Sequence, residues 1–527
     1  MIAAGDTDPT EVIGKLWREV LKVPSVAAGD DFFAVGGHSM LATRLMSRLR
    51  TALGPGLPAG LVFEHPVFAD LVAAVRGCLS AAAQQAGPVA AARGEGPVSL
   101  QQEELLRIEA VLGPSPLHNI VVPARTVSDV DAGVLRAALR VVLDRHPALR
   151  LRFPGTGRQV VGPPPAMSEV DLEVIDEPGD EAAIRRTVRR AHLRPFDLVA
   201  GNLVRAQLFR AAGGDLLVLH LHHLCVDGLS QSVLLDDLAE AYGALNGGSA
   251  PAPAEPGPDY LDYAGWQRAE LPALLKRSRP HWRGVITTLA ADRVPGERPG
   301  RAGRYHRAVA TVPAETLAAL RVWARPEGVT DFVACAAAVA AGVAKVTGRS
   351  RVGLGTLLDN RSFAAFEHSI GPFATSTLLA VDTGEAATGR KLALTVREQL
   401  RAARRFSDAP LAVLLDLPCA EHGLEPGELV DAVVVLDQPY QPAPESPLPL
   451  APILDHVEPL VNAAVGAPLS VSLFLPEGGG LRVTAEVPGT DAADADALAR
   501  ALAGAVHDLA TTPDEPAVTE PGAAVAR

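Results

Sequence analysis

The regular spacing of large apolar residues stops over residues 80–97, where Ala, Gln, Gly, Pro and Arg take their place. A stretch of this kind cannot bury one face against a core, so it predicts a linker over residues 81–96. We therefore expect two separately folded units, residues 5–80 (the first unit) and residues 97–510 (the second unit). Pro and acidic residues dominate residues 511–527, which predicts a disordered tail.

The two units differ in their apolar patterns. In the first unit, apolar residues recur every three or four positions over residues 11–21, 40–53 and 69–79, which predicts a small all-α, four-helix bundle. The second unit alternates strand-like and helix-like segments, which indicates an α/β fold. A Pro- and Gly-rich stretch over residues 246–259 predicts that this unit has two lobes.

Charge and cysteine content argue against several classes of function. The 61 Asp and Glu residues outnumber the 48 Lys and Arg residues, and the net charge of −13 argues against nucleic acid as a partner. The four Cys residues lie far apart, so we expect a reduced, cytoplasmic protein without a metal site. The longest uncharged apolar run, residues 332–344, is too short to span a bilayer and predicts a buried helix. We expect no export signal and no membrane role.

Ser39 stands directly before a predicted helix and follows two glycines, Gly36 and Gly37, that permit a tight turn. Because Ser is a preferred N-cap residue, a purely structural role is one interpretation. The other is that an exposed hydroxyl at this place can be modified, with an attached phosphodiester near the positive end of the helix dipole. The residue types by themselves leave both interpretations open.

Four segments of the first unit occur in the order of a known family: Trp17-Arg-Glu-Val20, Asp30-Asp-Phe-Phe33, Gly36-Gly-His-Ser39 and Phe63-Glu-His-Pro66. With them, the unit resembles the peptidyl carrier domain of nonribosomal peptide synthetases over nearly its whole length. The resemblance implies that Ser39 carries 4'-phosphopantetheine, whose thiol holds an acyl group as a thioester. It also implies a phosphopantetheinyl transferase as a partner.

A His-His-x-x-x-Asp-Gly motif begins at the end of a predicted strand, Leu216–His223. Alternation along a strand places His222 on one face and His223 on the other, so only one of them can face a given cavity. An imidazole can accept a proton from an attacking amine or hydrogen-bond it into position, because its pKa lies near neutrality. Asp227 needs a cationic or donor partner if it is buried, which favours a structural role. Gly228 indicates a turn into the following helix.

Further segments of the second unit follow in the order of one family: Arg145-His-Pro-Ala-Leu-Arg-Leu-Arg-Phe153, Pro195-Phe-Asp-Leu198, Tyr260-Leu-Asp-Tyr-Ala-Gly-Trp266, His281-Trp-Arg283, Gly355-Thr-Leu-Leu-Asp-Asn-Arg361 and Ile370-Gly-Pro-Phe373. Together with the histidine motif, they make residues 97–510 similar to the condensation domain of the same synthetases. The resemblance implies an α/β, two-lobed, chloramphenicol-acetyltransferase-like fold. Its lobes are expected at about residues 97–275 and 276–510, with a tunnel between them.

The resemblance also implies roles for single residues. His223 matches the key catalytic histidine of the family, and His222 and Gly228 complete the motif around it. Asp227 matches an aspartate that forms a structural ion pair, for which Arg361 is the expected partner. Three segments depart from the family pattern, namely residues 99–106, 374–380 and 406–411, and in the family they lie toward the tunnel and the lobe interface.

The resemblance implies transfer of an acyl, aminoacyl or peptidyl group from the thioester on Ser39 to an amine, as in the biosynthesis of nonribosomal peptide antibiotics. Ester formation to a hydroxyl acceptor would use the same residues and stays open. Epimerisation is a further alternative, although epimerisation domains usually have a glutamate-containing element where this chain has Leu357–Arg361. The three segments that depart from the family pattern leave one more alternative open, in which the second unit is a non-catalytic platform that recruits a tailoring enzyme.

We find no segment that resembles an adenylation domain, a thioesterase or a second carrier. We therefore expect an adenylation enzyme to load Ser39 in trans. The acceptor is expected to arrive on another carrier protein or as a free small molecule.

Overall fold

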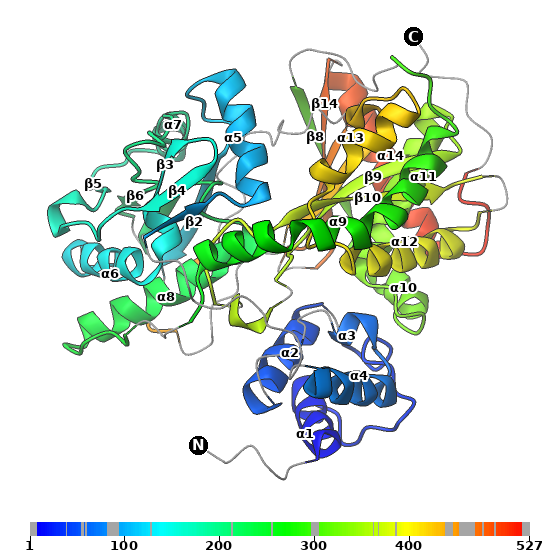
Figure 1. Cartoon of the computed structure of the whole chain (residues 1–527), viewed down its shortest axis with the longest axis horizontal. Helices are drawn as coiled ribbons and strands as arrows, with labels where there is room; N and C mark the ends of the chain where they lie inside the picture. The colour runs from blue at the N-terminus through cyan, green and yellow to red at the C-terminus, as the bar shows by residue number, and fades with distance from the viewer. Residues whose placement is uncertain are drawn as a thin grey trace.

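A computed structural model of the chain (Figure 1) provides the structure of most residues. The described residues are 8–37, 39–53, 57, 61–81, 94–126, 129–211, 214–253, 257–296, 305–361, 363–366, 368–384, 387–437, 446–448, 450–452, 469–476, 479–489 and 492–518. The predicted linker over 81–96 therefore lies largely outside the described residues.

The first unit is the expected all-α bundle. Its described residues form α1 (Pro9–Leu21), α2 (Ser39–Leu53), α3 (Leu61–Glu64) and α4 (Phe68–Ala81). Trp17 packs edge-to-face against Phe32 and Phe68, with ring centroids 5.0 and 5.5 Å apart. This aromatic centre gives the small unit a core of its own, because aromatic side chains bury large areas.

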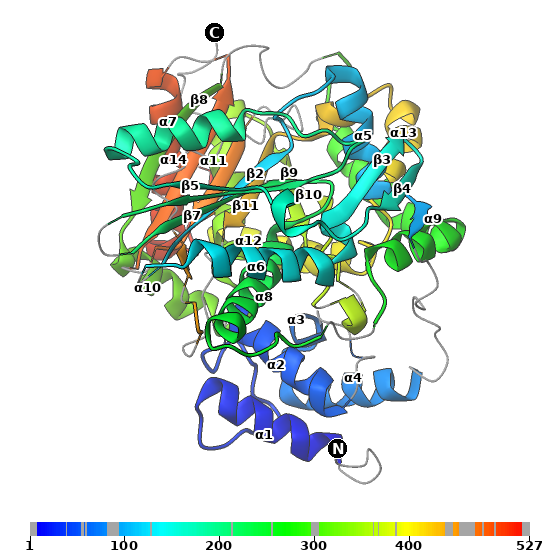
Figure 2. The ribbon, with the colours of Figure 1, turned by 90° about the vertical axis from the view of Figure 1, so that its left-hand side faces the viewer.

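The first lobe of the second unit is built on a five-stranded sheet of order β12-β2-β7-β6-β5. Its strands are β2 (Asn119–Thr126), β5 (Leu172–Ile175), β6 (Val204–Phe209), β7 (Leu216–His222) and β12 (Leu450–Pro452). The helices are α5 (Leu100–Leu112), α6 (Ala132–Arg145), α7 (Glu181–His192) and α8 (Gly228–Asn246). Figure 2 shows α6 and α8 on the opposite side of the sheet from α7. A small sheet of order β1-β4-β3 adjoins this lobe, with β1 (Glu95–Pro97), β3 (Leu151–Gly155) and β4 (Arg158–Val161).

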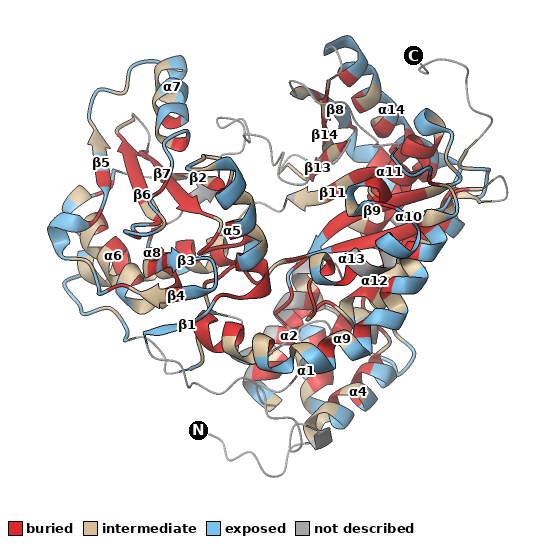
Figure 3. Cartoon of the chain, turned by 45° about the horizontal axis from the view of Figure 1, so that its top comes forward, coloured by how far each residue is buried: buried red, intermediate tan, exposed pale blue. Residues whose placement is uncertain are grey.

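The second lobe contains a six-stranded mixed sheet of order β10-β9-β11-β13-β14-β8. Its strands are β8 (Tyr305–Val312), β9 (Arg351–Leu358), β10 (Thr375–Asp382), β11 (Ala432–Asp437), β13 (Ser470–Phe474) and β14 (Leu481–Pro488). The helices are α10 (Ala314–Ala324), α11 (Asp331–Thr347), α12 (Gly389–Arg404), α13 (Leu411–Glu421) and α14 (Ala492–Thr511). Figure 3 shows the buried residues concentrated on the sheets and on the helix faces that cover them.

The predicted buried helix over 332–344 is α11. All residues from Val333 to Ala344 are buried, because α11 packs on the sheet and is flanked by α12 and α14, which contact the same sheet. No helix among the described residues combines the length and the apolar character needed to cross a membrane.

The lobe boundary expected at about residue 275/276 falls inside a helix. One continuous helix, α9 (Tyr260–Ala290), runs across that position and extends along both lobes (Figure 1), although it contains Pro272 and Pro280. In addition, β12 lies far along the chain yet pairs antiparallel with β2 in the first lobe. The two lobes are therefore joined by α9, which they share, and by β12, which pairs with a strand of the first lobe. The periodicity of apolar residues does not reveal such long-range pairing.

Two ends of the second unit also differ from expectation. The unit begins before residue 97, because β1 pairs with β4 from Glu95 onward. The segment expected to be disordered is ordered over its described part, residues 511–518. Arg390 of α12 forms an ion pair with Asp514 at 2.7 Å, and the N–H of Ala517 donates to the carbonyl of Ala387 at 2.9 Å. Contacts with α12 and with the residues just before it therefore hold this segment in place.

Candidate functional site

The histidine motif lies where β7 ends. The strand stops at His222, and His223 begins a turn that leads to α8, so the expected strand Leu216–His223 is one residue too long. The N–H of His223 donates to the carbonyl of His118 at 2.8 Å. The next N–H, of Leu224, donates to Nδ1 of His222 at 3.1 Å. The turn, rather than strand alternation, therefore determines the direction of the His223 imidazole.

His223 is partly exposed, unlike His222, which is fully buried. Its Nδ1 is buried, which leaves Nε2 for contact with a substrate. Burial lowers the pKa of His223 below the ordinary 6.5, while the negative charge of Asp227 acts in the opposite direction. The imidazole is therefore neutral at neutral pH, the state in which it can accept a proton.

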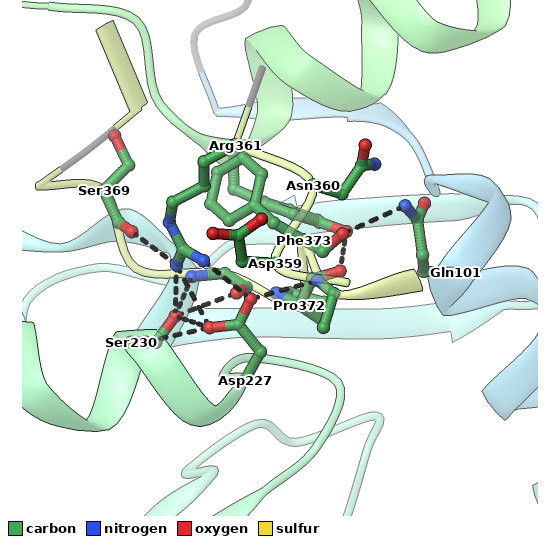
Figure 4. Close-up of polar contacts among 12 residues, drawn as sticks. Gln101, Asp227, Ser230, Asp359, Asn360, Arg361, Ser369, Pro372 and Phe373 are labelled. Carbon is green, nitrogen blue, oxygen red and sulfur yellow. Dashed lines mark hydrogen bonds and ion pairs between the residues drawn. The ribbon is translucent and has the colours of Figure 1, made fainter. Parts of the chain in front are cut away.

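Asp227 and Arg361 form a buried, two-pronged ion pair (Figure 4). Arg361 donates from Nη1 to Oδ2 at 2.9 Å and from Nη2 to Oδ1 at 3.0 Å, and the partners are 134 positions apart. Burial alone would raise the pKa of Asp227, but the charge of Arg361 and the hydrogen bonds from Arg361 and Ser230 outweigh it and lower the pKa. The guanidinium also lies over the ring of Phe373, 4.5 Å from its centroid.

The remaining acceptor positions of Asp227 are occupied as well. Its carboxylate caps α8 by accepting the N–H of Ser230 at 2.8 Å, and it accepts the N–H of Ala374 at 3.0 Å. Because α8 belongs to the first lobe and Ala374 to the second, Asp227 joins the lobes beside the motif. A carboxylate with this many donors is a poor base, which fits the structural role expected for it.

Gly228 is the first residue of α8 and is exposed. A methyl group at this position would meet no atom within 4 Å, so local packing does not require glycine. The space beside Gly228 is therefore open at the first turn of α8, where the Ser230 N–H is already capped by Asp227.

A buried cluster of Glu109, His118 and His222, here called the His–Glu–His cluster, was not predicted from the sequence. His118 Nδ1 lies 2.6 Å from Glu109 Oε1, and His222 Nε2 lies 3.8 Å from the same oxygen. One signal was available: with Gln102 and Leu106, Glu109 falls on the buried face of α5, where an unpaired carboxylate would be costly.

The cluster has the residue types of a metal site, since its donor atoms lie within 4.8 Å of one another. A histidine that ligates a metal normally donates a hydrogen bond from its other ring nitrogen. Nδ1 of His222 instead accepts the N–H of Leu224 and cannot carry a proton, so in the neutral ring Nε2 must carry it. The hydrogen bonding therefore fits a proton-bearing cluster better than a metal centre.

The segment 99–106, which departs from the family pattern, contacts the motif directly. The side chain of Gln102 donates to the carbonyl of Leu224 at 3.2 Å, within the turn that follows His223. Gln101 donates to the carbonyl of Phe373 at 3.3 Å, near the Arg361 ion pair (Figure 4). The start of α5 thus connects the histidine turn with the second lobe.

Ser39 lies in the first unit, as the first residue of the 15-residue helix α2. The turn before it is tight: a methyl group at Gly37 would lie 2.4 Å from the carbonyl oxygen of Phe32. The first turn of α2 contains no acidic residue. A phosphodiester attached at this end of the helix would therefore meet the positive end of the dipole without a nearby carboxylate in that turn, so the site fits such a group.

Each of the two units matches a known protein family. The family described as condensation domain matches residues 92–451, and the family described as phosphopantetheine attachment site matches residues 11–75. These families agree with the two resemblances that the motifs carry.

Similar proteins include one of the linear gramicidin synthase subunits of Brevibacillus parabrevis, which is 32% identical over 446 residues, 82% of this chain and 6% of the relative. A dimodular nonribosomal peptide synthase of Bacillus subtilis is 31% identical over 431 residues, 78% of this chain and 18% of the relative. The chain thus spans less than a fifth of the length of these relatives.

Two solved structures have the same fold. The X-domain from teicoplanin biosynthesis is 24% identical, with a TM-score of 0.66 over 82% of this chain and 99% of the other. The first condensation domain of the calcium-dependent antibiotic synthetase, in complex with a substrate analogue, is 21% identical, with a TM-score of 0.66 over 81% and 99%.

Proposed function

The chain belongs to the condensation domain family, with a phosphopantetheine attachment domain ahead of the condensation domain, and from this we propose that it forms amide bonds in nonribosomal peptide synthesis. The donor would be an acyl, aminoacyl or peptidyl thioester on the first unit, and the acceptor an amine. The observation that carries the proposal is the complete histidine motif on a rigid turn, with His223 partly exposed and its pKa lowered.

When attached to Ser39, the phosphopantetheine group supplies a terminal thiol that holds the acyl group as a thioester. His223 would accept a proton at Nε2 as the acceptor nitrogen bonds to the carbonyl carbon and the carbon–sulfur bond breaks. His223 would then return this proton to the sulfur of the departing thiolate. Backbone N–H groups near Gly228, at the N-terminus of α8, are suited to stabilise the negative charge on the carbonyl oxygen.

Asp227 and Arg361 would hold the two lobes around this reaction, and His222 would keep the turn in place. Confining the thioester and the amine makes the reaction effectively intramolecular, which is worth several kcal/mol of the barrier. Ester formation to a hydroxyl acceptor would use the same residues.

The partners follow from the carrier unit. A phosphopantetheinyl transferase would modify Ser39, an adenylation enzyme would load it, and other synthetase domains or a free small molecule would supply the acceptor. The similar synthetases are much longer than this chain, which spans 6% and 18% of two of them, so they are long enough to include further domains.

A second candidate is a non-catalytic platform for a tailoring enzyme. It is favoured by the fold shared with the X-domain, of which a complex with OxyB from teicoplanin biosynthesis is known. The complete motif in this chain, including Asp227 with its ion pair, supports the catalytic role instead.

The test uses the full chain modified at Ser39 and loaded with an aminoacyl group, to which candidate amines and alcohols are added. Intact-mass analysis should show loss of the acyl group from Ser39 and formation of an amide product. We expect His223→Ala to lower turnover by about 10²- to 10⁴-fold, because a general base of this kind contributes that much.

His422→Ala, at an exposed histidine on the second lobe, is the matched control and should retain wild-type turnover. Ser39→Ala should abolish transfer from the chain's own carrier and leave transfer from a free thioester intact. Full turnover in His223→Ala would contradict the catalytic assignment. Co-purification of a tailoring enzyme without any acyl transfer would support the platform.

A further inference from the structure

The His–Glu–His cluster lies where three elements end or begin. Glu109 is in the last turn of α5, His118 directly precedes β2, and His222 is the last residue of β7. All three side chains are more than nine-tenths buried, with exposed fractions of 8%, 3% and 1%. An acid in such a place must have partners, because burying a lone carboxylate is costly.

The protonation of the cluster follows from its hydrogen bonds. Burial alone would raise the pKa of Glu109, but the two histidines outweigh it and lower the pKa to about 2, so the carboxylate is ionised and only accepts. His118 must then donate from Nδ1 at 2.6 Å. His222 directs Nε2 toward the same oxygen at 3.8 Å, and its Nδ1 accepts the N–H of Leu224 at 3.1 Å. The hydrogen bond from Leu224 requires the Nε2–H tautomer of His222, and the nearby Glu109 carboxylate favours the same tautomer.

The same two histidines hold the backbone of His223 from both sides. The carbonyl of His118 accepts the N–H of His223 itself, and Nδ1 of His222 accepts the N–H of the next residue, Leu224. Glu109 therefore contacts the imidazoles of both residues that hold the turn carrying His223, although it does not touch His223 itself.

We propose that Glu109 is a positioning residue, which fixes His222 in the Nε2–H tautomer and thereby holds the turn that aims His223. This inference rests on the proposed function for its effect on turnover. The tautomer of His222 is a separate observable that does not depend on any activity.

The experiment uses Glu109→Gln in the full chain. The variant keeps the size of the side chain and one acceptor oxygen, but it removes the negative charge that both histidines face through Oε1. Loss of this charge should weaken the preference of His222 for a proton at Nε2, because a neutral amide oxygen is a weaker acceptor than a carboxylate. We expect kcat to fall by about one to two orders of magnitude, as for small misplacements of a reacting group, with KM for the acceptor nearly unchanged.

The decisive readout is the nitrogen NMR spectrum of protein labelled with ¹⁵N-histidine, with the His222 signals assigned by a His222→Gln variant. The wild-type protein should show a protonated Nε2 and a bare Nδ1 on His222, and Glu109→Gln should shift His222 toward the other tautomer. Glu181→Gln is the matched control, because Glu181 is an exposed acid on α7 of the same lobe and pairs with Arg185 on the surface. It should leave both kcat and the His222 signals unchanged.

Three results would overturn the proposal. A bare Nε2 on His222 in the wild-type protein overturns it without any variant, even if Glu109→Gln fails to fold. Wild-type kcat in a folded Glu109→Gln variant overturns it as well. A lowered kcat with an unchanged His222 tautomer would mean that Glu109 acts only through packing. If the wild-type chain transfers no acyl group, the proposed function fails, while the NMR result still decides the role of Glu109.

Discussion

At the scale of single residues, the motif is held by the buried carboxylate of Asp227, whose two oxygens both accept hydrogen bonds. Asp227 accepts from Arg361, from Ser230 and from the backbone of Ala374, so it connects the start of α8 with the second lobe. Asp227 and Arg361 expose only 1% and 3% of their surface, and a pair so deeply buried is costly to break. Stability and the geometry of the site are thus coupled through one ion pair.

We expect Arg361→Met to destabilise the second unit by about 3–5 kcal/mol, because it leaves the Asp227 carboxylate buried without its countercharge. Thermal and urea unfolding of the full chain measure the effect. The double variant Asp227→Asn with Arg361→Met should recover part of the loss, since it removes the uncompensated charge.

The matched control is Arg185→Met on α7. Because the Arg185–Glu181 pair is exposed, we expect this variant to change the free energy of unfolding by less than about 1 kcal/mol. An Arg361→Met variant as stable as the wild-type chain would show that the ion pair contributes nothing to folding.

At the scale of elements, β7 and the end of α7 place several histidines in the core of the first lobe. Burial, with a smaller contribution from the charge of Arg205, lowers the pKa of His192 to about 4 and of His220 to about 3. An unfolded chain would bind protons at these histidines near pH 6.5, whereas the folded chain does not. The unfolded state therefore binds more protons, and stability rises with pH.

We expect the chain to lose stability as the pH falls from about 6.5 toward 4, through protonation of the unfolded state at these histidines. His192→Gln should weaken this dependence, because glutamine does not titrate. Urea midpoints measured between pH 7 and 4.5 check the effect. An equal dependence of stability on pH in His192→Gln and in the wild-type chain would contradict the prediction.

At the scale of the whole molecule, the first unit lies against the second lobe near α12 (Figures 1 and 2). The Arg404 guanidinium lies over the ring of Phe63 in α3, 5.3 Å from its centroid. A methyl group at Gly328 would lie 3.7 Å from Oδ2 of Asp31 and 4.0 Å from Nη2 of Arg401, so these groups of the two units are close together. Asp31 uses its other oxygen, Oδ1, to accept the N–H of Phe33 at 2.8 Å.

We expect Arg401→Glu to slow acyl transfer from Ser39 several-fold, because it replaces attraction to Asp31 by repulsion. Transfer from a free thioester, which does not need the first unit, should stay at the wild-type rate. Asp31→Asn should weaken transfer from Ser39 in the same way while keeping the Oδ1 acceptor of the turn.

Rates at low and high salt provide the measurement, since screening weakens attraction between exposed charges. Arg185→Glu, on the first lobe, is the control. An equal loss of transfer from Ser39 and from the free thioester in Arg401→Glu would show a general defect instead of impaired docking.

Much of the fold could be predicted from local patterns. Helical periodicity indicated α1, α2, α4 and α11, and the change to alternating elements indicated the α/β unit. These features depend on neighbours within a few residues, so the sequence carries them directly. The Asp227–Arg361 pair was expected only through the family resemblance, because no local pattern joins residues 134 positions apart.

The amino-acid sequence by itself determined the two units, the serine at the start of a helix and the histidine motif. Only the tertiary structure decided that β7 ends before His223, that β12 joins the first lobe, and that Glu109 contacts both His118 and His222. The physical reason is that helix and strand propensities act over a few residues, whereas a buried charge finds its partners wherever packing of the complete chain brings donors within hydrogen-bond distance.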